Sequence, residues 1–230
     1  MATPRTPRDH ASAAVRDRIM DVAEELMAGR GYAATSISAV CKESGLPVGS
    51  IYHHFGSKAG LLHAVAERGS RRFFADLPDA DSFPGSPQER LAAHYRAAAR
   101  TVLAHLSFFR IDVALLLQPT DDPEVRAIMT EVREGAVRQV SAILASIAAD
   151  AGAPDAPTLA RHLATMTVVF TRGAVCEAAA DPAAFGSAFD GLRAMVWGRI
   201  EEQVRRDAAD GRPVTRDAGS PQAATRSSSG

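Results

Sequence analysis

The stretch SGLPVGSIYHHFGSKAGLL, residues 44–62, contains the signals that decide the fold of this chain of 230 residues. Gly45 is placed to end one helix in a left-handed conformation, and a second helix of about two turns follows over residues 47–54. Ser57 can cap a further helix, which begins at Lys58. Two short helices joined by so tight a turn form a helix-turn-helix, in which the first helix supports the second.

The second of these helices is predicted to be buried on one side only. Ile51 and Phe55 are four residues apart and therefore share a helix face, which can reach the core together with Leu46. A helix this short is not stable alone, so it depends on that anchored face. The opposite face is left outside, and it carries Val48, Gly49, Ser50, Tyr52 and His53.

This outer face has the chemistry of a DNA-contacting surface. Ser50 can donate or accept a hydrogen bond at a base edge or a phosphate, and Tyr52 and His53 reach further from the helix. Gly49 removes a side chain where the helix backbone would press on a duplex. Lys58 lies at the positive end of the next helix, where it can hold a phosphate. We therefore expect this helix to bind double-stranded DNA.

The rest of the chain is also predicted to be helical. Hydrophobic residues make up 46% of the sequence and aromatic residues 6%, alanine is abundant and β-branched runs of strand length are scarce, which predicts an all-α fold. Around the helix-turn-helix, apolar periodicity predicts a helix over 13–28, a short one capped by Thr35 or Ser36, and one from Lys58 to Leu77. After a proline-rich break it predicts five more, over residues 88–105, 107–117, 123–149, 157–180 and 186–205.

These patterns divide the chain into four parts. Residues 12–76 are expected to form a helix-turn-helix domain with a connecting helix, and residues 77–206 a larger helical bundle. The two ends, residues 1–11 and 207–230, are rich in Pro, Gly, Ser and Arg. They contain too few apolar residues to offset the entropy of ordering them, so both are predicted to be disordered tails.

Residues 16–62 resemble the DNA-binding domain of the tetracycline-repressor (TetR) family of bacterial transcriptional regulators. The matching elements are G-Y, T-S-I, S-G-L, S-I-Y-x-H-F and S-K-x-x-L-L, all in order. The resemblance implies a three-helix DNA-binding head, a connecting helix, and a body of five or more helices that binds a ligand and dimerises. It also implies phosphate contacts for Ser36, Tyr52 and Lys58 and base-facing positions for Val48, Gly49, Ser50 and His53.

The last two long helices are candidates for a homodimer interface. They contain small residues, which let helices approach closely, and then larger apolar residues. In the resembled family the equivalent pair forms a four-helix bundle with its copy. A packing surface within one chain would have the same composition, so the residues alone leave both interpretations open. They are Ala160, Ala164, Gly173, Ala174, Ala178, Phe189, Leu192, Met195, Val196 and Trp197.

Three of the predicted body helices mix apolar bulk with isolated polar groups, as a pocket for a small-molecule effector requires. A core with a few hydrogen-bonded histidines has the same mixture, so the pocket is implied by the resemblance more than by composition. The candidate ligand-binding residues are His105, Phe108, Phe109, Asp112, Met129, His162, Met166 and Phe170, with Arg172 beside them.

We expect a ligand-responsive, sequence-specific transcriptional regulator, in its simplest form a repressor released from an inverted-repeat operator by a small molecule. A regulator controlled by another protein is one alternative. An enzyme is a more distant one, because the chain has no G-x-x-x-x-G-K-[ST], H-E-x-x-H or G-x-S-x-G motif. We therefore expect neither catalysis nor a cofactor.

Composition excludes several other classes. The formal net charge of -1 argues against a uniformly polycationic chain. Cys41 and Cys176 lack paired spacing, so reduced, buried thiols are expected instead of a disulfide scaffold or zinc site. The neighbouring His53 and His54 point about 100° apart on a helix and chelate a metal poorly. No apolar run reaches the ~18 residues of a membrane span, so the protein is expected in the cytoplasm and away from membranes.

Overall fold

The computed structural model describes residues 7–118, 120–178 and 181–209, and within these ranges it contains helices and no strands. The expected all-α fold is confirmed. None of the helices in the described ranges is long and apolar enough to cross a membrane. The helices are α1 (Pro7–Arg30), α2 (Ile37–Ser44), α3 (Val48–Phe55), α4 (Lys58–Asp76), a 3-10 turn (Ala80–Ser82), α5 (Pro87–Ala104), α6 (Leu106–Leu117), α7 (Pro123–Asp150), α8 (Ala156–Ala178) and α9 (Pro182–Ala209).

Local capping sets the boundaries of the short helices. The Ser36 side chain accepts a hydrogen bond from the backbone N–H of Ala39 at 3.1 Å and so caps α2, a role that Thr35 does not take. Gly45 ends α2 with a φ of 70°, in the left-handed region that favours glycine. Ser57 caps α4 by accepting from a backbone N–H one turn further on, at 2.8 Å. The predicted turn and the predicted cap at Ser57 are confirmed.

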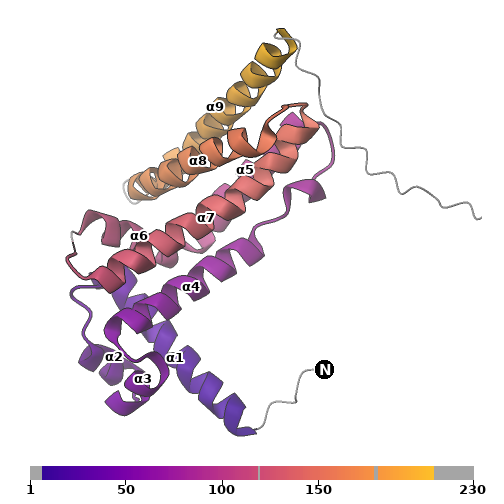
Figure 1. Cartoon of the computed structure of the whole chain (residues 1–230). Coiled ribbons are helices and arrows are strands. Elements are labelled where there is room, and N and C mark those ends of the chain that lie inside the picture. The colour runs from indigo at the N-terminus through magenta and orange to yellow at the C-terminus, as the bar shows by residue number, and fades with distance from the viewer. Residues whose placement is uncertain (1–6, 119, 179–180, 210–230) are drawn as a thin grey trace, which may run out of the picture.

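The helices form two groups joined by α4 (Figure 1). Helices α1 to α3 lie together at one end of the molecule, and with the first turns of α4 they form the head. Helix α4 then runs beside α7 into the body, which consists of α5 to α9. Helices α8 and α9 lie on the side of the body away from α4. This is the predicted order of head, connecting helix and helical bundle.

The core of the head continues into the body. It contains buried residues of the first four helices, such as Ile19, Ile51 and Leu61, and it also takes in Ile111 and Leu115 from α6. The first turns of α7 add buried apolar residues to the same cluster. Burial of this shared apolar surface holds the head on the body, since each Å² removed from water contributes about 25 cal/mol.

A buried arginine ties α4 to α1. The side chain of Arg68 is only 7% exposed. Its Nη1 donates to Asp21 Oδ1 at 2.7 Å and to the backbone carbonyl of Asp17 at 3.4 Å, and its Nη2 donates to Glu24 Oε2 at 2.8 Å. Because the carboxylates belong to α1 and the guanidinium to α4, these ion pairs fix how the connecting helix crosses the head.

Helices α1 and α9 are longer than the sequence suggested. Helix α1 begins at Pro7, inside the predicted N-terminal tail, because proline suits the first position of a helix, where no backbone donor is needed. Helix α9 ends at Ala209, three residues into the predicted C-terminal tail. The rest of both predicted tails, residues 1–6 and 210–230, lies outside the described part of the chain.

The expectation of two buried thiols was wrong. Cys41 is only half-buried, at the edge of the head core, and Cys176 is exposed on α8. The sequence pattern placed both on apolar helices. Cys176 nevertheless points outward, because its neighbours Ala174 and Val175 take the two buried positions of that turn.

Candidate functional site

Helix α3 is anchored on one face and open on the other. Ile51 is completely buried, and Phe55 is half-buried, with the guanidinium carbon of Arg16 5.4 Å from its ring centroid. On the open face, Tyr52 is 52% exposed and Val48 is 51% exposed. The predicted one-sided burial of this helix is therefore confirmed.

The other predicted base-facing residues lie on or beside this open face. Gly49 and His53 are exposed, whereas Ser50 is half-buried and marks the edge of the face. A Cβ atom built at Gly49 would meet no atom within 4 Å. The first turn of α3 therefore leaves its backbone open to a ligand as large as a duplex.

The turn that carries α3 is held from below. Arg18 Nε on α1 donates to the backbone carbonyl of Ser44 at 2.6 Å, at the end of α2. The Ser44 hydroxyl in turn accepts from the backbone N–H of Leu46 at 3.3 Å, inside the turn. These bonds connect the start of α3 to the longer α1, so a short helix is presented on a fixed support.

Two of the predicted phosphate-contacting residues, Lys58 and Ser36, already have hydrogen-bond partners within the chain. Lys58 Nζ lies 4.2 Å from the ring centroid of Tyr32 and donates to the backbone carbonyl of Ala33 at 3.3 Å. Burial lowers the pKa of Lys58 from its ordinary value. Since an ammonium group has three donors, Lys58 keeps others for an anion. Ser36 is exposed at the N-terminus of α2, where the helix dipole also attracts a phosphate.

The two histidines of α3 contact each other, with His53 exposed and His54 half-buried. The ring centroids of His53 and His54 are 5.1 Å apart in an edge-on arrangement. Burial is the main cause that lowers the pKa of His54, and the charges of His53 and Arg16 add to it. Among the described residues, no group of three or more His, Cys, Asp and Glu side chains is placed to hold a metal ion.

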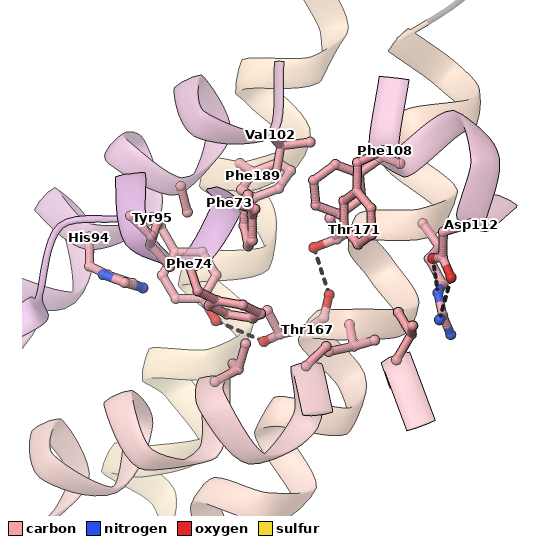
Figure 2. A pocket seen from close by; sticks show the side chains of 18 of the residues that line it. Phe73, Phe74, His94, Tyr95, Val102, Phe108, Asp112, Thr167, Thr171 and Phe189 are labelled. Carbon is pink, nitrogen blue, oxygen red and sulfur yellow. Dashed lines mark hydrogen bonds and ion pairs between the residues drawn. The ribbon is translucent and has the colours of Figure 1, made fainter. Parts of the chain in front are cut away.

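The body contains a mainly apolar cavity (Figure 2). The volume of the cavity is about 80 Å³. Helices α4 to α9 all contribute to the wall, and apolar side chains of α7 close one side of it. Six aromatic residues line the cavity: Phe73, Phe74, Tyr95, Phe108, Phe109 and Phe189.

The polar groups of the cavity are hydrogen-bonded to each other or to the backbone. Tyr95 Oη lies 2.8 Å from Thr167 Oγ1, and the guanidinium of Arg172 binds both carboxylate oxygens of Asp112, at 2.7 and 3.0 Å. His94 Nδ1 lies 3.3 Å from the backbone carbonyl of residue 78. Burial raises the pKa of Tyr95 to about 12 and lowers that of His94.

The structure gathers three of the eight predicted ligand-binding residues in this cavity, namely Phe108, Phe109 and Asp112, together with Arg172. The other five lie elsewhere. His105 pairs with Asp76 at 2.8 Å, and Phe170 packs against the body core from a half-buried position. The remaining three are Met129, which lines a smaller void beside α6, and His162 and Met166, which line a groove between α8 and α9.

The sequence pattern did not reveal the α5 residues of the cavity or its threonines on α8. On α8 the prediction followed His162, Met166 and Phe170, whereas the cavity is lined by Thr167 and Thr171. Consecutive helix positions differ by about 100° in direction, so an error of one residue turned the predicted face away from the cavity. The fully buried Leu163, which has the same spacing as Thr167 and Thr171, was the signal that could have corrected it.

Comparisons with known proteins match this head and this fold. Residues 19–65 match the family model of bacterial regulatory proteins, tetR family. The transcriptional regulator UidR of Escherichia coli is 35% identical over 60 residues, which are 26% of this chain and 31% of UidR. The transcriptional repressor KstR2 of Mycolicibacterium smegmatis is 29% identical over 99 residues, which are 43% of this chain and 47% of KstR2.

The fold resembles solved structures over most of the length of the chain as well. Salmonella enterica GusR superposes with a TM-score of 0.63 at 23% identity, over 82% of this chain and 96% of GusR. The sequence matches to UidR and KstR2 span less than half of either protein. Together, the helix-turn-helix geometry, the family model over residues 19–65 and these relatives show that the head of this chain is similar to the tetR family of bacterial regulatory proteins.

Proposed function

We propose that the protein is a sequence-specific DNA-binding transcriptional regulator that acts as a repressor. The observation that carries the proposal is the geometry of α3, whose Ile51 face is buried in the head while Val48, Tyr52 and His53 are exposed. A helix supported in this way can lie in the major groove of DNA. KstR2, which is 29% identical to this chain over 99 residues, is itself named a repressor. In this proposal the protein acts in the cytoplasm, where it binds a double-stranded DNA operator.

In this proposal, two sets of residues divide the work. Ser36, Tyr52 and Lys58 hold phosphates and fix the position of the head on the duplex. Base edges face Val48, Gly49, Ser50 and His53, and specificity comes from these contacts. Gly49 has no side chain to read a base, so Val48, Ser50 and His53 carry the direct readout.

Substitutions in the two sets are expected to have different effects. Lys58→Gln and Tyr52→Phe should weaken binding to operator and to scrambled duplex alike, and Lys58→Gln should reduce the slope of log affinity against log salt by about 1. His53→Ala should instead change the preferred base, by about 1–3 kcal/mol of discrimination. Fluorescence anisotropy at several salt concentrations measures both. Wild-type affinity for operator in the Tyr52 and Lys58 variants would contradict the assignment of phosphate contacts.

The operator itself can be found by selecting bound duplexes from a random pool with the purified protein at stated salt. We expect an inverted repeat, because two recognition helices related by a two-fold axis read two half-sites about 34–36 Å apart or at a related spacing. No affinity for any duplex in dilute buffer would overturn the proposed function.

We infer that the dimer forms through α8 and α9. Most of the small and apolar residues singled out on these helices are buried within the chain, among them Ala160, Ala164 and Leu192. The outer surface of the pair nevertheless keeps exposed apolar side chains. Met166 on α8 is 44% exposed and Val169 62%, and Met195 on α9 is 47% exposed. A second copy that covered this surface would remove them from water.

A charge on this surface is expected to separate the dimer. Val169→Glu and Met195→Glu should each raise the dimer dissociation constant by at least about 30-fold, because a carboxylate would be buried without a partner. Sedimentation equilibrium measures the shift. Leu117→Glu is the matched control, since Leu117 is an even more exposed apolar residue, at 72%, on α6. A dimer unchanged by both α8 and α9 variants would place the interface elsewhere.

Release from DNA by a small molecule in the cavity is the regulation we propose. Phe73 and Phe74 belong to α4, so the wall of the cavity includes the helix that leads to the head. Phe108 packs so closely on α4 that a Cβ atom at Gly69 would lie 2.6 Å from its ring. A ligand that displaces these rings pushes on α4 and changes the separation of the two heads. The ligand can shift the equilibrium between the two conformers only by as much as its affinities for them differ.

Control by another protein is the alternative. It is supported if operator binding persists in the presence of every compound that binds the cavity, because ligand binding would then be uncoupled from the head. Anisotropy of labelled operator, titrated with compounds that bind the free protein, distinguishes the two.

A further inference from the structure

We propose that the cavity of the body binds an uncharged, ring-containing molecule with one hydrogen-bonding oxygen, and that it discriminates against carboxylates. This inference rests on the proposed function, since it names the effector class of a ligand-responsive regulator. It concerns binding to the free protein, however, and can be tested without DNA.

The charges in the cavity wall cancel. Asp112 and Arg172 are the only carboxylate and guanidinium among the described residues that line it, and they bind each other through two hydrogen bonds. Their side chains are only 10% and 13% exposed. An anionic ligand would have to displace Asp112 from Arg172 and leave that carboxylate buried without a partner, which costs several kcal/mol. A cationic ligand would have to displace Arg172 from Asp112 and leave the guanidinium buried without a partner.

The other titratable groups of the wall add no charge near neutral pH. Burial lowers the pKa of His94, so its ring is neutral, and a pKa of about 12 keeps Tyr95 protonated. A charged ligand would therefore lose its hydration and gain no counter-charge. An uncharged ligand avoids this cost.

The shape and chemistry of the wall suit rings. Phe109 lies edge-on to Phe73, with the centroids 5.1 Å apart and the planes at 89°, and it has Phe108 at the same centroid distance. A ring inserted among them can continue this edge-to-face packing, which contributes about 0.5–1.5 kcal/mol per aromatic pair beyond the burial of area. Phe74, which is half-buried, and Val132 line both the cavity and the groove outside it between α4 and α7, so the ligand enters there.

One polar anchor for the ligand is available. The hydroxyls of Tyr95 and Thr167 bind each other at 2.8 Å, and only one of their two protons is used in that bond. The pair therefore keeps one donor and spare lone pairs inside an apolar wall (Figure 2). A single hydroxyl or carbonyl oxygen on a ring satisfies this requirement, whereas a pure hydrocarbon does not.

Isothermal titration of the full-length protein at pH 7 with naphthalene, 2-naphthol and 2-naphthoate tests the proposal. These compounds share one ring system and differ in the polar group. We expect 2-naphthol to bind most tightly and 2-naphthoate most weakly. Tyr95→Phe and Thr167→Val should each weaken 2-naphthol by about 3- to 10-fold, the effect of one hydrogen bond, and leave naphthalene unchanged. Thr165→Val is the matched control, because Thr165 is exposed on the same helix.

A second variant reverses the charge preference. Asp112→Asn keeps the shape of the side chain but leaves Arg172 without its counter-charge, so it should raise the affinity for 2-naphthoate at least about tenfold and change that for 2-naphthol little. Thermal melting establishes that each variant is folded. If the wild type binds 2-naphthoate as tightly as 2-naphthol, or binds none of the three compounds, the inference is overturned while the DNA-binding proposal stands. If the three compounds bind as expected but the protein has no affinity for any duplex, the proposed function is overturned and the inference about the cavity stands.

Discussion

Removing both carboxylates that face Arg68, by Asp21→Ala and Glu24→Ala together, is expected to lower the free energy of unfolding by about 3 kcal/mol. The guanidinium is buried, with a side chain only 7% exposed, and these residues supply its two ion pairs at 2.7 and 2.8 Å. Without them a positive charge stays in the core with only the Asp17 carbonyl beside it. The value lies at the low end for a broken buried pair, because Asp21 is 59% exposed and water can enter there. Urea denaturation at fixed protein concentration measures it.

Adding Arg68→Met to the double variant tests whether the uncompensated charge of Arg68 causes the loss of stability. This third substitution should recover about 2 kcal/mol or more, since an apolar side chain of similar length needs no partner. Further destabilisation by Arg68→Met would show that packing, and not the uncompensated charge, dominates. Glu67→Ala is the control, because Glu67 pairs with Arg71 at 3.7 Å on the surface of α4 and such pairs contribute little.

Gly49→Glu is expected to abolish operator binding, by at least about 100-fold, without destabilising the fold. The Cβ position of Gly49 is open and exposed, and replacing glycine inside a helix stabilises that helix. In a complex with DNA, however, the new carboxylate would face the phosphates and base edges, and like charges brought together cost several kcal/mol. Anisotropy with labelled operator and thermal melting of the same sample measure the two effects.

The matched control places the same charge far from α3. Ala149 is exposed at the last turn of α7, at the end of the body remote from the head. Ala149→Glu changes the net charge equally and should change operator affinity less than about threefold at 0.15 M salt, where charges are screened beyond about 8 Å. Near-wild-type binding by Gly49→Glu would mean that α3 does not lie in the groove.

The features that sequence predicted well are those that depend on neighbours along the chain. Ser57 and Gly45 act within one helical turn, so their roles as cap and stop could be inferred without knowing the fold. The buried face of α3 follows from the spacing of Ile51 and Phe55 alone. Because the head is built from such short-range signals, its candidate DNA-contacting residues could be proposed from the sequence.

The cavity depends on contacts between distant segments, and there the predictions were less complete. Asp112 and Arg172 are 60 residues apart, and Tyr95 and Thr167 are 72 apart. Nothing local indicates that such side chains meet. Their meeting is decided by how α5, α6 and α8 are rotated about their axes, and an error of one residue in that rotation replaces Thr167 by Met166.

The continuation of the head core into α6 limits how far this protein can be treated as modular. Ile111 and Leu115 fill space beneath the first four helices, so a chimaera that grafts residues 7–76 onto another regulator must bring matching side chains in the acceptor's equivalent of α6. Without these side chains, the core of the grafted head would contain a cavity. The same dependence gives evolution a constraint, since exchanging the whole head requires compensating changes in α6, whereas substitutions on the exposed face of α3 do not.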